Sequence, residues 1–152
     1  MSESSVCLSF PAKAEYLLLA RLVVAGALRR LAFEEPEIAD LKLAVTEACG
    51  NAVRHAYVGR APGCVDLELV PCPDRLEVVV SDTGAGIRLP LPERPPAPSE
   101  AGGMGLGIIR SVVDEVEITR GPGGRGTIVH MIKLSPPRAG SDGRDKTDRS
   151  RV

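Results

Sequence analysis

Residues 41–57 read LKLAVTEACGNAVRHAY, a pattern with two different helical faces. A helix is predicted over 36–57, because residue 36 is a proline, which is favoured in a first helical turn. At about 100° per residue, the apolar residues of its buried side are Ile38, Leu41, Val45, Ala48 and Ala52. Glu47, Asn51 and Arg54 share another face, which is either solvated or functional.

The residue types on the polar face point to phosphate chemistry. Gly50 lies near this face, and a glycine inside a helix costs about 1 kcal/mol relative to alanine, so it usually marks a close approach. A carboxylate, an amide and a guanidinium beside such a gap would suit a metal-bound polyphosphate. A solvated helix face remains the alternative.

Periodicity and alternation on either side of this helix predict the remaining elements. Strands are expected at 6–10, 64–70, 75–81, 115–119 and 127–134, and the other helices at 12–33 and 105–113. This order predicts an α+β fold, a two-layer α/β sandwich with three helices on a mixed, mostly antiparallel sheet. Five prolines between 88 and 99 indicate an exposed loop. Residues 1–135 are expected to form the domain, and residues 136–152 a disordered tail.

Composition excludes several classes of protein. The chain has 152 residues, 43% of them hydrophobic, which suits one domain. A net charge of −1 and the absence of Trp argue against direct binding of nucleic acid. The apolar run at 22–28 is too short to span a membrane and the amino terminus lacks a signal peptide, so we expect a cytoplasmic protein. Four cysteines without a C-x-x-C pair give no zinc pattern.

A second motif is VVVSDTGAGI at 78–87, where Asp82 ends an apolar strand and Gly84 and Gly86 follow. The glycines allow a ligand to approach the backbone, and the carboxylate can accept hydrogen bonds from an amino group. An Asp-initiated turn explains the motif equally well. An aspartic protease also carries Asp-Thr-Gly, but it needs two such carboxylates, here from a homodimer, and it consists almost entirely of strands. Two long predicted helices argue against that reading.

A third motif is GGMGLG at 102–107, immediately before the third predicted helix. Free N–H groups at a helix start bind phosphate readily, although a flexible hinge would also use these glycines. A G-x-G-x-x-G pattern occurs only at 121–126, where it precedes a strand and so fails as a dinucleotide-binding fingerprint. Because a Walker A sequence and the motif set of the usual protein kinases are also absent, any ATP site must have another architecture.

These three motifs, in this order, resemble the N, G1 and G2 boxes of the GHKL ATPases, whose nucleotide pocket is the Bergerat fold. Within that superfamily, residues 41–57 most resemble the anti-sigma-factor serine/threonine kinases, and the similarity covers about residues 6–134. The run from Gly103 to Gly107, followed by Asp-Glu-Val at 114–116, is also similar to that branch.

The resemblance implies ATP and Mg²⁺ as cofactors and a role for each matched residue. Glu47 would be the general base toward a serine hydroxyl, and Asn51 would hold Mg²⁺ against the phosphates. Asp82 would bind the adenine amino group with the help of Thr127, and Arg54 would contact phosphate. The other implied nucleotide-binding residues are Gly84 and Gly86 on the adenine side, and Gly103, Met104, Gly105, Leu106 and Gly107 in the lid.

The resemblance also implies partners. These are a sigma factor that the protein sequesters, an anti-anti-sigma protein of the STAS type that it phosphorylates, and a second copy in a homodimer. No arginine directly precedes the glycine cluster, so the γ-phosphate contact stays open between Arg88, Arg94, Arg54 and none. His55 is expected to be structural. The alternative function is a catalytically inactive, nucleotide-responsive module that only binds its partner.

Overall fold

A computed structural model describes residues 5–31, 33–86 and 104–136. The predicted loop at 88–99, with Arg88 and Arg94, lies outside these ranges, as do Gly103 and the predicted tail beyond residue 136. None of the helices within the described ranges is long and apolar enough to cross a membrane.

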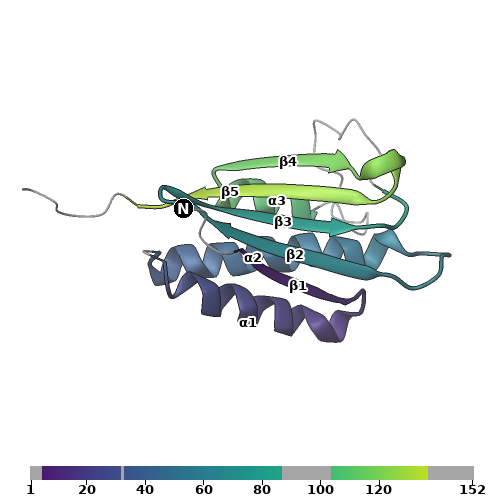
Figure 1. Ribbon diagram of the computed structural model, residues 1–152, viewed down its shortest axis with the longest axis horizontal. Helices are drawn as coiled ribbons and strands as arrows, with labels where there is room; N and C mark the ends of the chain where they lie inside the picture. Colours follow the sequence, from purple (N-terminus) through teal and green to yellow (C-terminus); the bar gives the residue numbers. More distant parts are fainter. Residues whose placement is uncertain (1–4, 32, 87–103, 137–152) are drawn as a thin grey trace, which may run out of the picture.

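Five strands form one sheet, with the order β1-β2-β3-β5-β4 and four antiparallel pairings. The strands are β1 (Val6–Pro11), β2 (Cys64–Pro71), β3 (Arg75–Asp82), β4 (Glu115–Arg120) and β5 (Thr127–Leu134). Three helices cover one face of this sheet (Figure 1). They are α1 (Leu17–Leu28), α2 (Glu35–Asn51) and α3 (Met104–Val112). The predicted two-layer fold is therefore confirmed, with antiparallel pairing throughout these strands.

Alternation of side chains along the strands places the core between the helices and the inner face of the sheet. In β2, Val65, Leu67 and Leu69 are buried, while the residues between them are exposed or half-buried. The start of α2 has a capping box, in which the Glu37 side chain accepts the Glu34 backbone N–H at 3.0 Å. This cap fixes where α2 begins, and hence where its polar face lies relative to the sheet.

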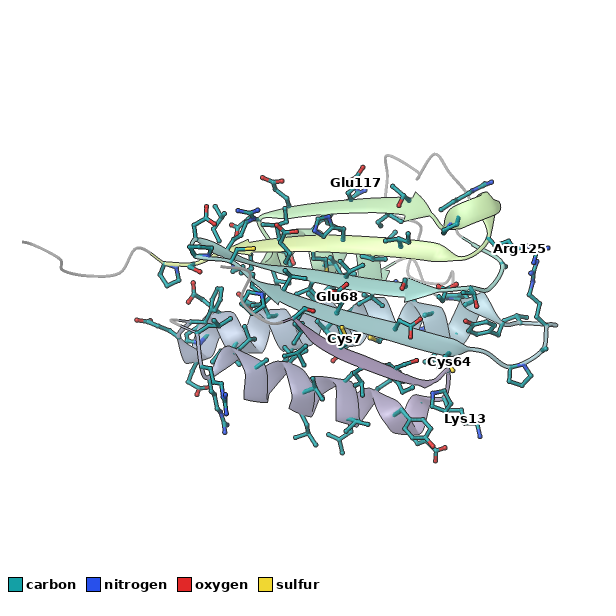
Figure 2. All side chains as sticks on the ribbon, viewed as in Figure 1. Cys7, Lys13, Cys64, Glu68, Glu117 and Arg125 are labelled. Atoms are coloured by element: carbon teal, nitrogen blue, oxygen red, sulfur yellow. The ribbon has the colours of Figure 1, made fainter. Side chains whose placement is uncertain are left out.

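The other face of the sheet carries charged side chains, among them Glu68 and Glu117 (Figure 2). On this face Glu77 forms an ion pair with Arg75 at 2.7 Å, and its Oε2 lies within hydrogen-bond distance of His130 Nε2 at 3.0 Å. The hydrogen bond from Arg75, followed by that from His130, holds the pKa of the Glu77 carboxyl below its usual range, although burial opposes this.

Both long helices are shorter than predicted. The segment expected as one helix at 12–33 begins with a 3₁₀ turn at Ala14–Tyr16, which is followed by α1. After α1 the chain makes a tight turn, in which the Leu31 N–H donates to the Leu28 carbonyl oxygen at 3.0 Å. The helix expected at 36–57 is α2, continued by a π-helical turn, η2 (Ala52–Ala56). A π turn changes the direction of the last carbonyl groups, and such turns are frequent at functional sites.

Candidate functional site

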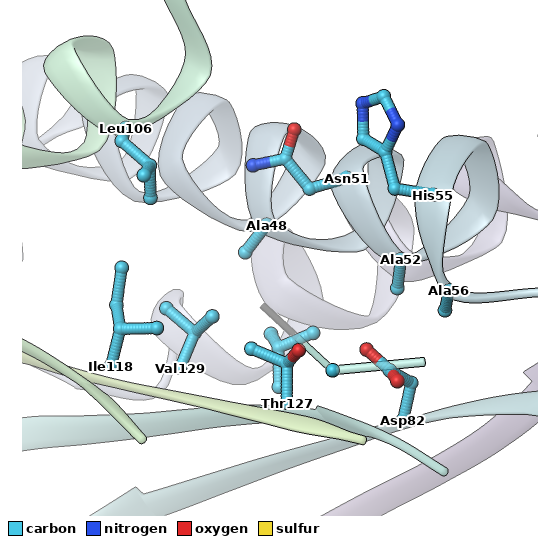
Figure 3. Close-up of a pocket in the computed structure, with 12 residues that line it drawn as sticks. Ala48, Asn51, Ala52, His55, Ala56, Asp82, Leu106, Ile118, Thr127 and Val129 are labelled. Atoms are coloured by element: carbon cyan, nitrogen blue, oxygen red, sulfur yellow. The ribbon is translucent and has the colours of Figure 1, made fainter. Parts of the chain in front are cut away.

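A cavity of about 280 Å³ lies between the end of α2 and the inner face of the sheet (Figure 3). Its lining residues are Ala48, Asn51, Ala52, His55 and Ala56 from α2 and η2, Val80, Asp82 and Gly86 from β3 and the segment after it, Leu106 from α3, and Ile118, Thr127 and Val129 from β4 and β5. Most of these side chains are apolar, and the polar ones are few. This is the composition of a site that takes a flat, mostly apolar group and fixes its orientation through a few hydrogen bonds.

Asp82 is the buried polar group of this cavity, with 8% of its surface exposed. Its Oδ1 accepts the Gly84 backbone N–H at 2.9 Å, and its carboxylate also accepts the backbone N–H of Thr127. Burial raises the pKa of Asp82, while these two hydrogen bonds act in the opposite direction. The structure therefore brings Asp82 and Thr127 together and leaves the carboxylate facing the cavity as an acceptor (Figure 3).

Glycine contacts join the three segments around Asp82. A Cβ on Gly84 would overlap the carbonyl oxygen of Ala56 in η2, and that oxygen accepts the Ala85 N–H at 2.7 Å. A Cβ on Gly126 would overlap the carbonyl oxygen of Asp82, and Gly126 N–H donates to Gly84 C=O at 2.9 Å. The end of η2, the exit of β3 and the entry to β5 are thus in backbone contact, which holds Asp82 in place.

Gly126 is a site residue that the sequence analysis missed. Residues 121–126 are considered there only as a dinucleotide-binding fingerprint, which they do not fit. The φ of Gly126 is +71°, a value that favours glycine, and its contact partner lies 44 residues away along the chain. Within the local sequence, its position immediately before Thr127, a predicted nucleotide-binding residue, could have identified Gly126 as a site residue.

The polar face of α2 is assembled as the sequence predicts. Arg54 Nη2 donates to Asn51 Oδ1 at 3.1 Å and lies 4.0 Å from Glu47 Oε2. Gly50 is the site of a close approach, but the approaching group is the guanidinium of Arg54, with Nη1 3.0 Å from where a Cβ would be. The gap expected beside Gly50 is therefore filled by the side chain of Arg54.

The first turn of α3 covers the polar face. A Cβ on Gly105 would lie 2.9 Å from Glu47 Oε2 and 3.3 Å from both polar atoms of the Asn51 amide. Leu106 lines the cavity, and Gly107 is exposed, with open space around it. The helix that begins at Met104 thus places its N-terminal N–H groups beside Asn51, where phosphate oxygens could bind.

The donor set fits a magnesium ion that is shared with phosphates. The amide oxygen of Asn51 is an oxygen ligand of the kind that Mg²⁺ takes, and Mg²⁺ usually has one or two protein ligands with water and phosphate oxygens. Across the described ranges, there is no group of three or more His, Cys, Asp or Glu side chains that could hold a metal ion.

His55 lies at the edge of the cavity. Its side chain is exposed and lines the cavity, where Figure 3 shows it beside Asn51 on the helix side. The expectation that His55 is structural stays a prediction.

Residues 10–133 match the family described as histidine kinase-like ATPase domain. The chain belongs to the histidine kinase-like ATPase family. Its GHKL fold, with an Asp82-Thr83-Gly84 turn held against a helix, excludes the aspartic-protease alternative.

Relatives of this histidine kinase-like ATPase include named kinases. It is 35% identical to the serine-protein kinase RsbW of Bacillus pumilus over 76% of this chain and 78% of that protein. It is 37% identical to the RsbW of Listeria monocytogenes over 74% of this chain and 78% of that protein. The crystal structure of the RsbU and RsbW domains of Rv1364c from Mycobacterium tuberculosis shares the fold, with a TM-score of 0.65 and 21% identity over 89% of this chain and 33% of that one.

Proposed function

We propose that this chain is an ATP-dependent protein serine/threonine kinase that also acts as an anti-sigma factor. The observation that supports this most is the arrangement of the cavity, which has Asp82 on the sheet side and Asn51 on the helix side, with Glu47 and Arg54 on the same helix face as Asn51. The similarity to RsbW serine-protein kinases along three quarters of the chain supports the same activity.

In this proposal the adenine lies over the apolar floor of the cavity and its amino group donates to the Asp82 carboxylate. The phosphates extend toward Asn51 and the first turn of α3. Asn51 Oδ1 would hold Mg²⁺, which when bound neutralises charge on the β- and γ-phosphates. Arg54 donates to this same oxygen, so its guanidinium lies beside the proposed Mg²⁺ position, where it could contact a phosphate.

Glu47 would act on the hydroxyl of the substrate serine or threonine. As that oxygen forms a bond to the γ-phosphorus, the bond between the γ-phosphorus and the leaving ADP oxygen breaks, and the hydroxyl proton passes to the Glu47 carboxylate. The products are a phosphorylated partner, ADP and a protonated Glu47. Phosphoryl transfer depends mainly on position and charge, so Asn51 should matter more than the base.

The proposed partners are those of an anti-sigma kinase. One is a sigma factor that the protein sequesters, and the other is an anti-anti-sigma protein of the STAS type that it phosphorylates. We also propose that the protein is cytoplasmic, forms a homodimer and regulates transcription without touching DNA. A shift in nucleotide state would select between the two partners if they differ in affinity for the region around α3.

The nucleotide site is tested by thermal unfolding with Mg-ATP, on the wild type and on Asp82→Asn. Ligand at about 100 times its dissociation constant should stabilise the folded protein by about 2.7 kcal/mol. The expected result is a shift in the wild type that is lost in the variant. A wild type that does not shift at millimolar ATP would refute the ATP-dependent function.

Phosphotransfer is tested separately, by incubating the protein with Mg-ATP and the anti-anti-sigma protein of the same organism. Intact-mass spectrometry should show one added phosphate on that protein. If ATP binds but no phosphate is transferred, the alternative holds, namely a nucleotide-responsive module that sequesters its partner without catalysis.

A further inference from the structure

Tyr57 is held between three elements just after η2. Its ring packs on Gly63, where a Cβ would overlap the aromatic carbons, and its hydroxyl donates to the Cys64 carbonyl oxygen at 2.6 Å. Gly63 directly precedes β2 and Cys64 begins it, so this contact joins the end of the α2–η2 helix to the start of β2.

The same hydroxyl also binds the turn that follows Asp82. Its oxygen accepts the Thr83 backbone N–H at 3.1 Å and lies 3.3 Å from Thr83 Oγ1. A phenol has one proton and two lone pairs. Since the proton is used on Cys64, the Thr83 hydroxyl is the donor to Tyr57, and all hydrogen-bonding capacity of the phenol is used within these three residues.

This anchor acts on Asp82 through the backbone. Thr83 and Gly84 directly follow Asp82, and the Gly84 N–H is one of the two donors that orient the carboxylate. Tyr57 itself is not among the residues that line the cavity. Its hydroxyl therefore holds the turn from outside, while the contact of Gly84 with Ala56 holds it from the side of η2.

We propose that Tyr57 is a positioning residue for adenine recognition, which keeps the Asp82-Thr83-Gly84 turn in the conformation that orients the Asp82 carboxylate. This inference rests on the proposed ATP function. The effect is confined to the adenine side, because the groups proposed to meet the phosphates, Asn51 and Arg54, are carried by the helix before Tyr57 and make no use of its hydroxyl.

The test is Tyr57→Phe, which keeps the ring on Gly63 and removes only the hydroxyl. The matched control is Tyr16→Phe, the second tyrosine of the chain, whose ring packs against Phe10 away from the cavity. Affinities for ATP and for inorganic triphosphate are measured with Mg²⁺. Tyr57→Phe should weaken ATP binding about three- to tenfold, the usual effect of one hydrogen bond, and leave triphosphate binding unchanged. Tyr16→Phe should change neither.

A purely structural role would lower both affinities of Tyr57→Phe by the same factor, and that result would overturn the proposal. Hydrogen exchange of the ligand-free proteins supplies a second readout. Amides of Thr83 and Gly84 should exchange faster in Tyr57→Phe, while the Leu67 amide in the middle of β2 should not change. Unchanged exchange at Thr83 and Gly84 would also overturn it. If the wild type binds no ATP, the proposed function fails, but the exchange result still decides whether Tyr57 positions the turn.

Discussion

Replacement of Gly126 by alanine should damage both the stability and the nucleotide site of this domain. At φ +71° a residue other than glycine is disfavoured by about 1–2 kcal/mol. The new Cβ would also overlap the Asp82 carbonyl oxygen and lie 2.9 Å from the Thr83 Cα, so that backbone must move, at a cost of about 1–3 kcal/mol for an overpacked site. Together these effects predict a loss of about 2–5 kcal/mol in the free energy of unfolding.

Gly123 offers a matched control in the same connection between β4 and β5. Its φ is +69°, but nothing lies within 4 Å of where its Cβ would be. Gly123→Ala should therefore lose only the backbone part, about 1–2 kcal/mol. Urea unfolding followed by circular dichroism gives both values, and the difference between the variants measures the close approach at Gly126.

The same substitution should weaken ATP binding, because a shift at Gly126 moves the Thr127 N–H away from the Asp82 carboxylate. Thermal stabilisation by Mg-ATP should shrink in Gly126→Ala and remain in Gly123→Ala. Equal stabilities of the two variants, within about 0.5 kcal/mol, would refute the claim that backbone contact at Gly126 builds the site.

Three other predictions concern the charges and thiols of the domain. Burial raises the pKa of Asp82 above its ordinary 3.8, so the folded state holds the proton more tightly than the unfolded state does. The stability that this gives is lost as the pH rises through the raised pKa. The stability of Asp82→Asn relative to wild type, measured by urea unfolding at several pH values, should therefore increase over that range. Glu47→Gln should lower partner phosphorylation about 10²- to 10⁴-fold, measured by intact mass, with ATP affinity nearly unchanged. Burial raises the pKa of the Cys49 thiol to about 12, so a thiol reagent should modify the exposed Cys7 and Cys64 in the native protein and reach Cys49 only in urea.

Local patterns predicted the sheet well and the helix ends poorly. Alternation at Val65, Leu67 and Leu69 shows directly which face of β2 is buried, because a strand has a period of two and one side faces the core. The helical run to about residue 57 was predicted, but a periodicity of 3.6 residues does not show that its last turn, Ala52–Ala56, is π-helical.

In the candidate site, contacts within one helix could be predicted from the sequence, whereas contacts between distant segments could not. Glu47, Asn51 and Arg54 lie within two helical turns, so their shared face follows from spacing alone. Gly126 and Tyr57 reach the turn after Asp82 from other elements, and no periodicity within one segment reports such contacts.

The strand order has a consequence for how this protein is made. β5 is the last strand in the part of the sequence that the structure describes, yet it lies between β3 and β4 and brings Thr127 and Val129 to the cavity. During synthesis, β4 therefore leaves the ribosome before the strand that connects it to the rest of the sheet. A nascent chain that stops short of β5 has an open edge at β3 and an incomplete cavity, and such edges are prone to aggregation. Because Thr127 and Val129 belong to β5, the full lining of the cavity exists only once this strand has been translated.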